Sequence, residues 1–419
     1  MNWELGTSDW ELAVPWKRGA GVSMNIGSIK NWSGRCSKAG VVLAVLLAAR
    51  VLAASERTAA NPAAPAQDSA SAGPENAQIP SAVHAMPQIE NGKVAQREVK
   101  ASLTQEVDEW AKAAVKAQWL GYAVPAVSSE HRTCCGNYGG DWNSEGCGPC
   151  RLESGGSGNN YNLLRGEVKL EGPSNLLVLL RAEDRKIGRA RAVSDGCALD
   201  AAGLQVTWLT GVKPVESVRL LERFVDERGG DRLSRGALMA IAMHADSSAD
   251  QVLAKFTAPD KPENLRKEAA FWAGEARGAS GLQLLKRMAK EDPSTEVRAQ
   301  VTFALSISPE GNAIDEMIRM AHEDASGHVR GQALFWLAQK AGNKASSTIS
   351  GAIDNDPDTD VKKKAVFALS QMPKDDGVPK LIQVAETNRN PEVRKQAMFW
   401  LGQSNDPRAL EFFEKVLGK

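Results

Sequence analysis

Residues 390–402 read NPEVRKQAMFWLG, and variants of this stretch recur with a period of about 32 residues back to Leu233. Aligning the copies brings apolar residues into columns that have the same period. Three columns are Leu233, Leu265, Val297, Val329, Val361 and Val393; Ala237, Ala269, Val301, Ala333, Ala365 and Ala397; and Ile241, Ala273, Leu305, Leu337, Leu369 and Leu401. Self-similarity at a fixed period of about 20–50 residues is typical of solenoids, so we expect a repeat array here.

Each repeat unit is expected to be a pair of helices. The three columns stand four residues apart, so they share one face of a first helix. A second helix follows in each unit, marked by the column Leu221, Leu253, Leu285, Met317, Ile349, Leu381 and Phe413. A hairpin of this kind cannot cover its apolar face alone, but stacked hairpins bury a continuous core. The pattern predicts a mainly α fold, with a solenoid of about six to seven hairpins over residues 201–419.

A polar pair of columns accompanies the apolar ones. The acidic column is Asp260, Asp292, Asp324 and Asp356, with Asn388 at the last position. The basic column, six residues later, is Arg266, Arg298, Arg330, Lys362 and Arg394. Each acid can cap the first helix of its own unit or accept from the basic residue of an adjacent unit. Either arrangement is a structural ladder rather than a catalytic site.

The pattern of residues 390–402, an Asn-Pro or Asp-Pro followed by Val-Arg, Ala and Leu-Gly, resembles HEAT repeats in their short, phycobilisome-lyase-type form. The resemblance runs from about Pro214 onward, and it implies an α-solenoid that presents surfaces to partners. Nothing in the sequence matches a bilin site. The similar deoxyhypusine hydroxylase family holds two irons with repeated His-Glu pairs. This chain has one such pair, His322-Glu323, so we expect no iron site.

An aromatic column departs from the usual pattern of that family. Phe271, Phe303, Phe335, Phe367 and Phe399 lie on the far side of the first helix from the apolar face. Each Phe could wedge against the neighbouring repeat, or the five could form an exposed ridge that binds a protein partner. Next to them, every second unit carries a Trp, and the units between carry Ala: Trp272, Ala304, Trp336, Ala368 and Trp400. We expect this second column to pack in the core.

The N-terminal region is interpreted as a targeting segment and a linker. In residues 1–54, Lys30, Arg35 and Lys38 precede a short apolar run over 41–49, and a small-residue cleavage pattern follows at 51–54. These features are typical of a secretory signal peptide, with an uncleaved anchor as the alternative. Met24 is a candidate for the true start. Residues 55–97, rich in Ala, Pro and Ser, are expected to be a flexible linker.

Residues 98–200 are expected to form a small Cys-rich α+β module. The pattern predicts a helix over 103–118, strands over 119–125, 163–170 and 176–181, and a hairpin that turns at 183–185 into 187–193. Residues 200–211 are interpreted as a degenerate first helix that caps the solenoid, because Trp208 stands two repeat periods before Trp272.

Five cysteines lie in this module: Cys134, Cys135, Cys147, Cys150 and Cys197. An exported protein meets an oxidising compartment, so disulfides are the first interpretation, with two bonds and one spare thiol. Zinc is the alternative, with thiolates at partly suitable spacing near His131. The run 147–150 also equals the thioredoxin active-site tetrapeptide, but neither flank predicts the strand and helix that such a site needs.

The equal numbers of basic and acidic residues limit the kinds of partner that the chain is expected to bind. Lys and Arg number 51, as do Asp and Glu, which argues against a nucleic-acid partner. No catalytic constellation is present, and zinc is the only cofactor considered. We expect a non-catalytic scaffold that binds a protein partner in the periplasm or outside the cell, with membrane contact only through an uncleaved leader. The alternative is a metal or redox sensor whose site lies in the Cys134–Cys150 loop.

Overall fold

The computed structural model describes residues 86–127, 133–135, 150–153, 161–163, 175–195, 198–228 and 230–418. The chain divides into two compact units, 1–82 and 83–419, and every described residue belongs to the second. The expected leader over 1–54 lies outside the described residues. No helix among the described residues is long and apolar enough to span a membrane.

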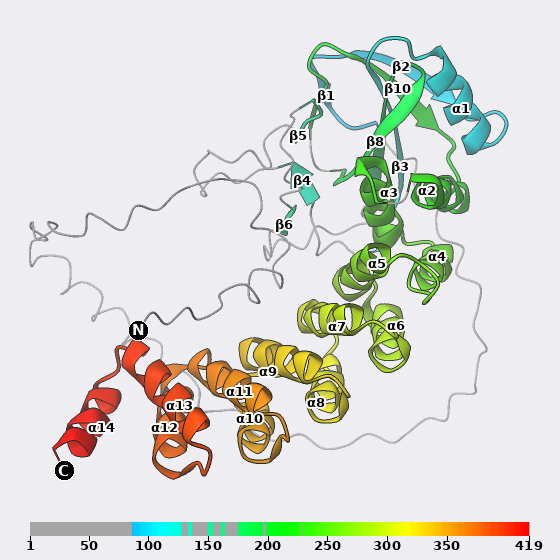
Figure 1. The fold of residues 1–419 in the computed structure, drawn as a ribbon. Helices are drawn as coiled ribbons and strands as arrows, with labels where there is room; N and C mark the ends of the chain where they lie inside the picture. The colour runs from blue at the N-terminus through cyan, green and yellow to red at the C-terminus, as the bar shows by residue number, and fades with distance from the viewer. Residues whose placement is uncertain are drawn as a thin grey trace, which may run out of the picture. The chain divides into compact units, whose positions relative to one another are not determined.

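The N-terminal part of the described chain is built on a five-stranded sheet (Figure 1). Its strands, in spatial order, are β2 (Lys93–Glu98), β10 (Gln205–Thr210), β3 (Gln118–Pro125), β7 (Asn175–Glu183) and β8 (Lys186–Ser194). The first three run parallel, whereas β3, β7 and β8 are successively antiparallel. The β7–β8 hairpin turns at Asp184 and Arg185, both with positive φ.

Side chains alternate between the two faces of this sheet, as the pleat requires. On one face, Leu120 and Tyr122 belong to a core that continues into the solenoid, and helix α1 (Leu103–Ala113) contributes Trp110 to it. On the opposite face, Trp119 and Trp208 form a second core. Both faces of the sheet are therefore buried.

Two smaller sheets accompany the large one. The first places β9 (Leu199–Asp200) between β1 (Ile89–Glu90) and β5 (Cys150–Arg151), with both pairings parallel. The second pairs β4 (Thr133–Cys135) with β6 (Tyr161–Leu163). Leu199 and Leu152, from the β9 and β5 region, lie in the second core, so this segment covers the face of the large sheet that the solenoid leaves free.

From Pro214 onward the described chain is entirely helical, with thirteen helices stacked in chain order (Figure 1). They are α2 (Pro214–Arg228), α3 (Arg232–Met243), α4 (Ser248–Phe256), α5 (Glu263–Ala276), α6 (Gly278–Glu291), α7 (Thr295–Ile307), α8 (Ala313–Glu323), α9 (Gly327–Ala341), α10 (Asn343–Asn355), α11 (Thr359–Ser370), α12 (Lys374–Thr387), α13 (Pro391–Gln403) and α14 (Pro407–Leu417). The odd-numbered helices from α3 carry the first apolar columns, and the even-numbered helices carry the second.

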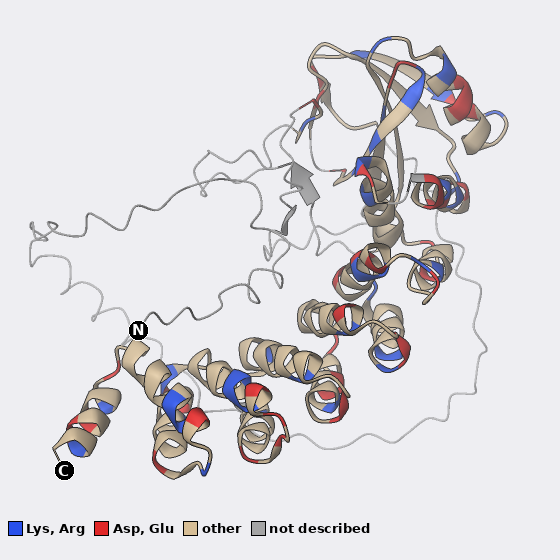
Figure 2. Cartoon of the chain, in the orientation of Figure 1, with Lys and Arg blue, Asp and Glu red and all other residues tan. Residues whose placement is uncertain are grey.

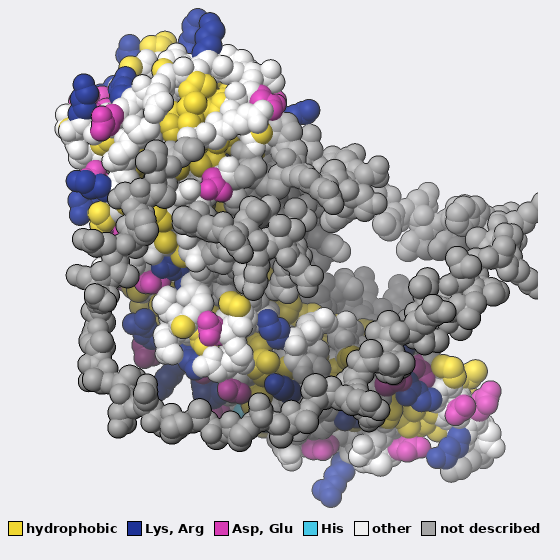
Figure 3. Space-filling view, turned by 180° about the vertical axis from the view of Figure 1, so that it is seen from behind, with side chains coloured by type: hydrophobic (Ala, Val, Ile, Leu, Met, Phe, Trp, Pro, Cys, Tyr) yellow, Lys and Arg dark blue, Asp and Glu magenta, His cyan; other side chains and the backbone are white. Residues whose placement is uncertain are grey.

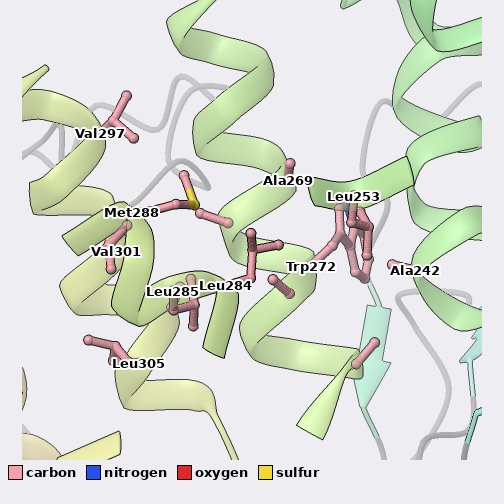
Figure 4. Packing of buried hydrophobic residues seen from close by; sticks show 14 of the residues in the cluster. Ala242, Leu253, Ala269, Trp272, Leu284, Leu285, Met288, Val297, Val301 and Leu305 are labelled. Atoms are coloured by element: carbon pink, nitrogen blue, oxygen red, sulfur yellow. The ribbon is translucent and has the colours of Figure 1, made fainter. Parts of the chain in front are cut away.

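The apolar columns form one continuous core along the stack. Val297, Val301 and Leu305 of α7 are all fully buried, and their counterparts in the other units are buried too. Figure 4 shows how large and small residues complement one another here: Trp272 points from α5 toward Leu253 of α4 and Ala242 of α3. The solenoid predicted from the repeat period is therefore present.

The solenoid and the sheet are directly joined. Helix α3 packs on β8, and a Cβ placed on Gly236 would lie 2.1 Å from the carbonyl oxygen of Ala190. Gly236 occupies the column that holds Glu268, Gln300 and Gln332 in later units. A glycine is required at position 236 because a side chain there would collide with the backbone of strand β8.

Several expectations from the sequence were wrong in detail. Residues 200–211 form no helix: 205–210 are strand β10, whose Val, Thr and Trp content suits a pleated sheet position between two parallel strands. The predicted helix over 103–118 ends at Ala113, and Gln118 already begins β3. The predicted linker over 55–97 includes β1 and most of β2, an edge strand with every residue exposed. The strand expected over 163–170 is described only at Leu163, in β6.

Candidate functional site

The aromatic column forms an unbroken path of ring contacts along the odd-numbered helices from α5 to α13. The rings of Phe271 and Phe303 stack with centroids 6.1 Å apart, and those of Phe335 and Phe367 with centroids 5.8 Å apart. Tilted contacts of 4.8 Å join Phe303 to Trp336 and Phe367 to Trp400. Edge contacts between sequence neighbours complete the path, which we call the aromatic ladder: Phe271, Phe303, Trp336, Phe335, Phe367, Trp400 and Phe399.

The rings of this ladder are only partly covered. The first four Phe side chains are half-buried, and Phe399, at the end of the ladder, is 44 % exposed. Each Phe therefore packs on its neighbour and also presents part of its ring to the surface. Trp272 is buried as expected, whereas Trp336 and Trp400 are half-buried because they lie within the ladder.

A column of amides lies beside the rings. Gln339, Gln371 and Gln403 are exposed and each stands four residues after a Phe of the ladder, one helical turn along the same face. Amide side chains both donate and accept hydrogen bonds. The face therefore offers apolar rings and uncharged hydrogen-bonding groups at the spacing of the repeat.

The polar columns form ion pairs between successive units. The guanidinium of Arg266 donates to both carboxylate oxygens of Asp292 at 2.8 and 3.2 Å. Arg298 binds Asp324, and Arg330 binds Asp356, with nearly the same two distances. We call this set the Arg–Asp ladder. Each Arg thus binds the acid that precedes the first helix of the next unit.

The same acids also accept a backbone hydrogen bond just before the first helix of their own unit, but the N-caps of α7 and α9 are the serines two residues later, Ser294 and Ser326. Asp292 accepts from the N–H of Ser294, and Asp324 accepts from the N–H of Ser326, just before α7 and α9. Arg298 in turn donates to the carbonyl of Asp292, at the end of α6. One ion pair therefore fixes the end of one helix and the start of the next.

The Arg–Asp ladder ends on each side where the sequence lacks one of the two charged residues that form a pair. Asp260 is exposed and has no ion pair among the described residues, because Ser234 occupies the basic position one unit earlier. At the other end, Lys362 donates to the carbonyl of Asp354, and the acidic position of the next unit is occupied by the uncharged Asn388. Among the described residues, Arg394 donates to the carbonyls of Asn388 and Arg389.

Of the five cysteines, the structure describes the side chain of Cys150. Cys150 is disulfide-bonded and fully buried in the second core. The backbone of Cys134 and Cys135 lies in β4, while Cys147 and Cys197 lie outside the described residues. No cluster of three or more metal-binding side chains occurs among the residues that the structure describes. His322 and Glu323 lie at the end of α8.

One buried polar chain was missed by the sequence analysis. The hydroxyls of Tyr122, on β3, and Ser217, on α2, lie 2.8 Å apart. The Ser217 hydroxyl lies 3.0 Å from Nε2 of His244, the C-cap of α3. Ser217 and His244 are 0 % exposed, so the pair has no access to a substrate and its role is structural. The three positions show no motif in the sequence, because they meet only through the fold.

His244 makes stability depend on pH. Burial lowers the pKa of His244 to about 4; the charge of Arg277 lowers it further, and Asp246 opposes both. Since the folded pKa lies below the unfolded value of about 6.5, this stabilisation is present above pH 6.5 and is lost as the pH falls towards 4. We expect a loss of about 3 kcal/mol from this residue. Urea unfolding at several pH values should show a smaller loss for His244→Gln, and equal losses in both proteins would contradict the assignment.

A second titratable group with a shifted pKa, the half-buried Glu268, lies on α5. Burial raises the pKa of Glu268 to about 7, and the charge of Arg235, on α3, opposes this. Basic and acidic residues are interspersed along the helices of the solenoid (Figure 2). Seen from behind, the described surface also carries both signs (Figure 3).

Comparison with known families identifies the repeat. Residues 346–419 match the family model for HEAT repeats, so the C-terminal region carries HEAT repeats. This agrees with the resemblance drawn from residues 390–402. The comparison with curated proteins found no match.

Solved structures of similar fold cover about half of the chain. YibA of Escherichia coli is 20 % identical, with a TM-score of 0.31 over 49 % of this chain and 76 % of that one. Human deoxyhypusine hydroxylase is 16 % identical, with a TM-score of 0.22 over 48 % and 77 %. The complex of CpcE and CpcF of phycocyanin lyase from Nostoc is 16 % identical, with a TM-score of 0.28 over 48 % and 80 %.

Proposed function

We propose that this chain is an exported, non-catalytic scaffold whose solenoid binds a protein partner on the face of the aromatic ladder. The observation that carries the proposal is the continuous path of half-buried rings from Phe271 to Phe399. Rings held against one another in this way lose little entropy on binding, which suits them as anchors for a partner.

The chemistry beside the ladder favours an extended polypeptide as the partner. An extended segment exposes backbone N–H and C=O groups on its edges and side chains on its faces. Gln339, Gln371 and Gln403 can bind such backbone groups, while the rings receive apolar side chains. Neither group carries charge, so the proposed contact depends little on salt.

Three observations support the remaining parts of the proposal. The disulfide at Cys150 supports export, because disulfides persist mainly in oxidising compartments. Its full burial in the second core supports a structural role for this cysteine, rather than the metal or redox sensor considered as the alternative. The buried Ser217–His244 pair lacks access to a substrate, which supports a non-catalytic role.

The test is a comparison of partner capture by matched variants. Phe335→Glu places a charge in the middle of the ladder, and Gln251→Glu places the same charge on an exposed site of α4. A partner captured by the wild type and by Gln251→Glu should bind the Phe335→Glu variant at least about tenfold more weakly, measured by calorimetry on purified proteins.

Phe335→Leu serves as a second variant, because it removes the ring and keeps an apolar side chain. Circular dichroism must show that each variant has the helical content of the wild type. A partner that binds all variants equally would contradict the proposal, and so would a wild-type protein that captures nothing more than Phe335→Glu does.

A further inference from the structure

The rings of the aromatic ladder set the spacing at which a bound segment meets them. Phe271 and Phe303 stack with centroids 6.1 Å apart. Within the described part of the chain, Phe303 and Phe335 have no direct ring contact, but both contact Trp336, at 4.8 and 4.9 Å. Their centroids are therefore farther apart than those of a stacked pair, and at most the sum of these two distances, about 9.7 Å. The step from one Phe to the next averages between about 6 and 8 Å. The second half of the ladder has nearly the same distances.

This step matches the period of one kind of backbone. A β-extended segment presents the same face at every second residue, about 6.4–6.8 Å apart. A polyproline II segment presents the same face about every 9.3 Å, and an α-helix about every 5.4 Å. Of these three periods, the one that lies within the range set by the rings is that of the extended segment.

We propose that the ligand of the aromatic ladder is a β-extended segment that lies along the stack with two of its residues to each repeat unit. This inference rests on the proposed function and specifies the partner. Because the ladder contains five Phe residues, the segment is a stretch of about nine residues with an apolar side chain at every second position. The apolar side chains meet the rings, and the side chains between them point away from the solenoid.

The amides beside the ladder fit the edge of such a segment. In an extended backbone, the N–H and C=O of one residue point to one edge, and those of the next residue point to the opposite edge. Each edge therefore offers one N–H and one C=O per two residues, which is one pair per repeat unit. Gln339, Gln371 and Gln403 supply one exposed amide per unit beside the last three Phe rings, and an amide both donates and accepts. Nε2 of Gln371 donates to the Ser370 hydroxyl, and this amide has a second N–H and an oxygen besides.

Calorimetry of the full chain with three synthetic peptides tests the register. The first is a nine-residue peptide in which Val alternates with Ser, and the second has the same composition with the Val residues in adjacent pairs. The third carries Pro at every third position, which favours polyproline II. The alternating peptide should bind at least about tenfold more tightly than either of the others, and Phe335→Glu should remove this difference. Gln371→Ala should weaken its binding about twofold to tenfold, whereas Gln251→Ala, at an exposed site of α4, should leave it unchanged.

The outcomes separate this inference from the proposed function. Equal binding of the first two peptides, or tighter binding of the Pro peptide, would overturn the two-residue register, although the ladder would still be a binding face if Phe335→Glu weakens partner capture. An alternating peptide that does not bind while partner capture depends on Phe335 would likewise overturn this inference alone. If Phe335→Glu changes neither peptide binding nor partner capture, both the register and the proposed function are wrong. Gln371 is exposed, so Gln371→Ala should keep the helical content of the wild type.

Discussion

Replacing Arg266 by methionine should lower the free energy of unfolding by about 3–5 kcal/mol. Arg266 and Asp292 have side chains only 5 % and 2 % exposed, so the variant leaves a buried carboxylate without its partner. Arg266 also donates to the carbonyls of Pro259 and Lys261, which lose a donor at the same time. Urea unfolding followed by circular dichroism measures the change.

The matched control for Arg266→Met is Asp260→Asn, in the same polar columns. Asp260 is exposed and unpaired among the described residues, so we expect a change within about 0.5 kcal/mol. The double variant Arg266→Met with Asp292→Leu should recover part of the loss, since it removes both charges. Recovery stays incomplete because Asp292 also accepts from the N–H of Ser294. A loss below about 1 kcal/mol for Arg266→Met would show that the pair is not buried as described.

Replacing Gly236 by valine should destabilise the protein by about 3 kcal/mol or more. Its Cβ would lie 2.1 Å from the backbone oxygen of Ala190, so helix α3 must move away from strand β8. Backbone atoms cannot rotate out of the way as a side chain can. The measurement is urea unfolding, with the near-ultraviolet circular dichroism of the buried Trp208 and its neighbours as a second signal.

Gly188→Val provides the control for this variant. Gly188 lies on β8, two residues before Ala190, and a Cβ there meets nothing within 4 Å. Valine favours extended backbone, so this change should be neutral or slightly stabilising. Equal destabilisation by the two substitutions would mean that the effect comes from β8 itself rather than from the contact with α3.

The repeat period was sufficient to predict the solenoid, since apolar columns at spacings of three and four residues, repeated about every 32 residues, are typical of stacked helical hairpins. It also indicated the Arg–Asp ladder. It could not decide whether Asp292 acts within its own unit or across units, because both partners recur at the same period. The structure shows that it does both.

The sheet was harder to predict from the sequence. Parallel strands β2, β10 and β3 come from three distant segments, and no turn signal links them. Trp208 was misleading, because its separation from Trp272 matches two repeat periods although Trp208 lies in a strand. One feature of the sequence could have indicated the contact between the sheet and the solenoid. Gly236 is a glycine inside a helix, and the same position in later repeat units holds a longer polar side chain. It marks the place where the sheet meets the stack.

The alternation of contacts along the aromatic ladder restricts how the number of repeat units can change. Phe–Phe stacks and Phe–Trp contacts follow one another in turn, because Trp336 and Trp400 are two units apart with Ala368 between them. The shortest segment that can be duplicated without changing the pattern of ring contacts is therefore two hairpins, or four helices. Duplicating or deleting one hairpin would set two Trp or two Ala side by side. We therefore expect that gains and losses of two hairpins at a time were tolerated during evolution. Gains or losses of a single hairpin should have been selected against.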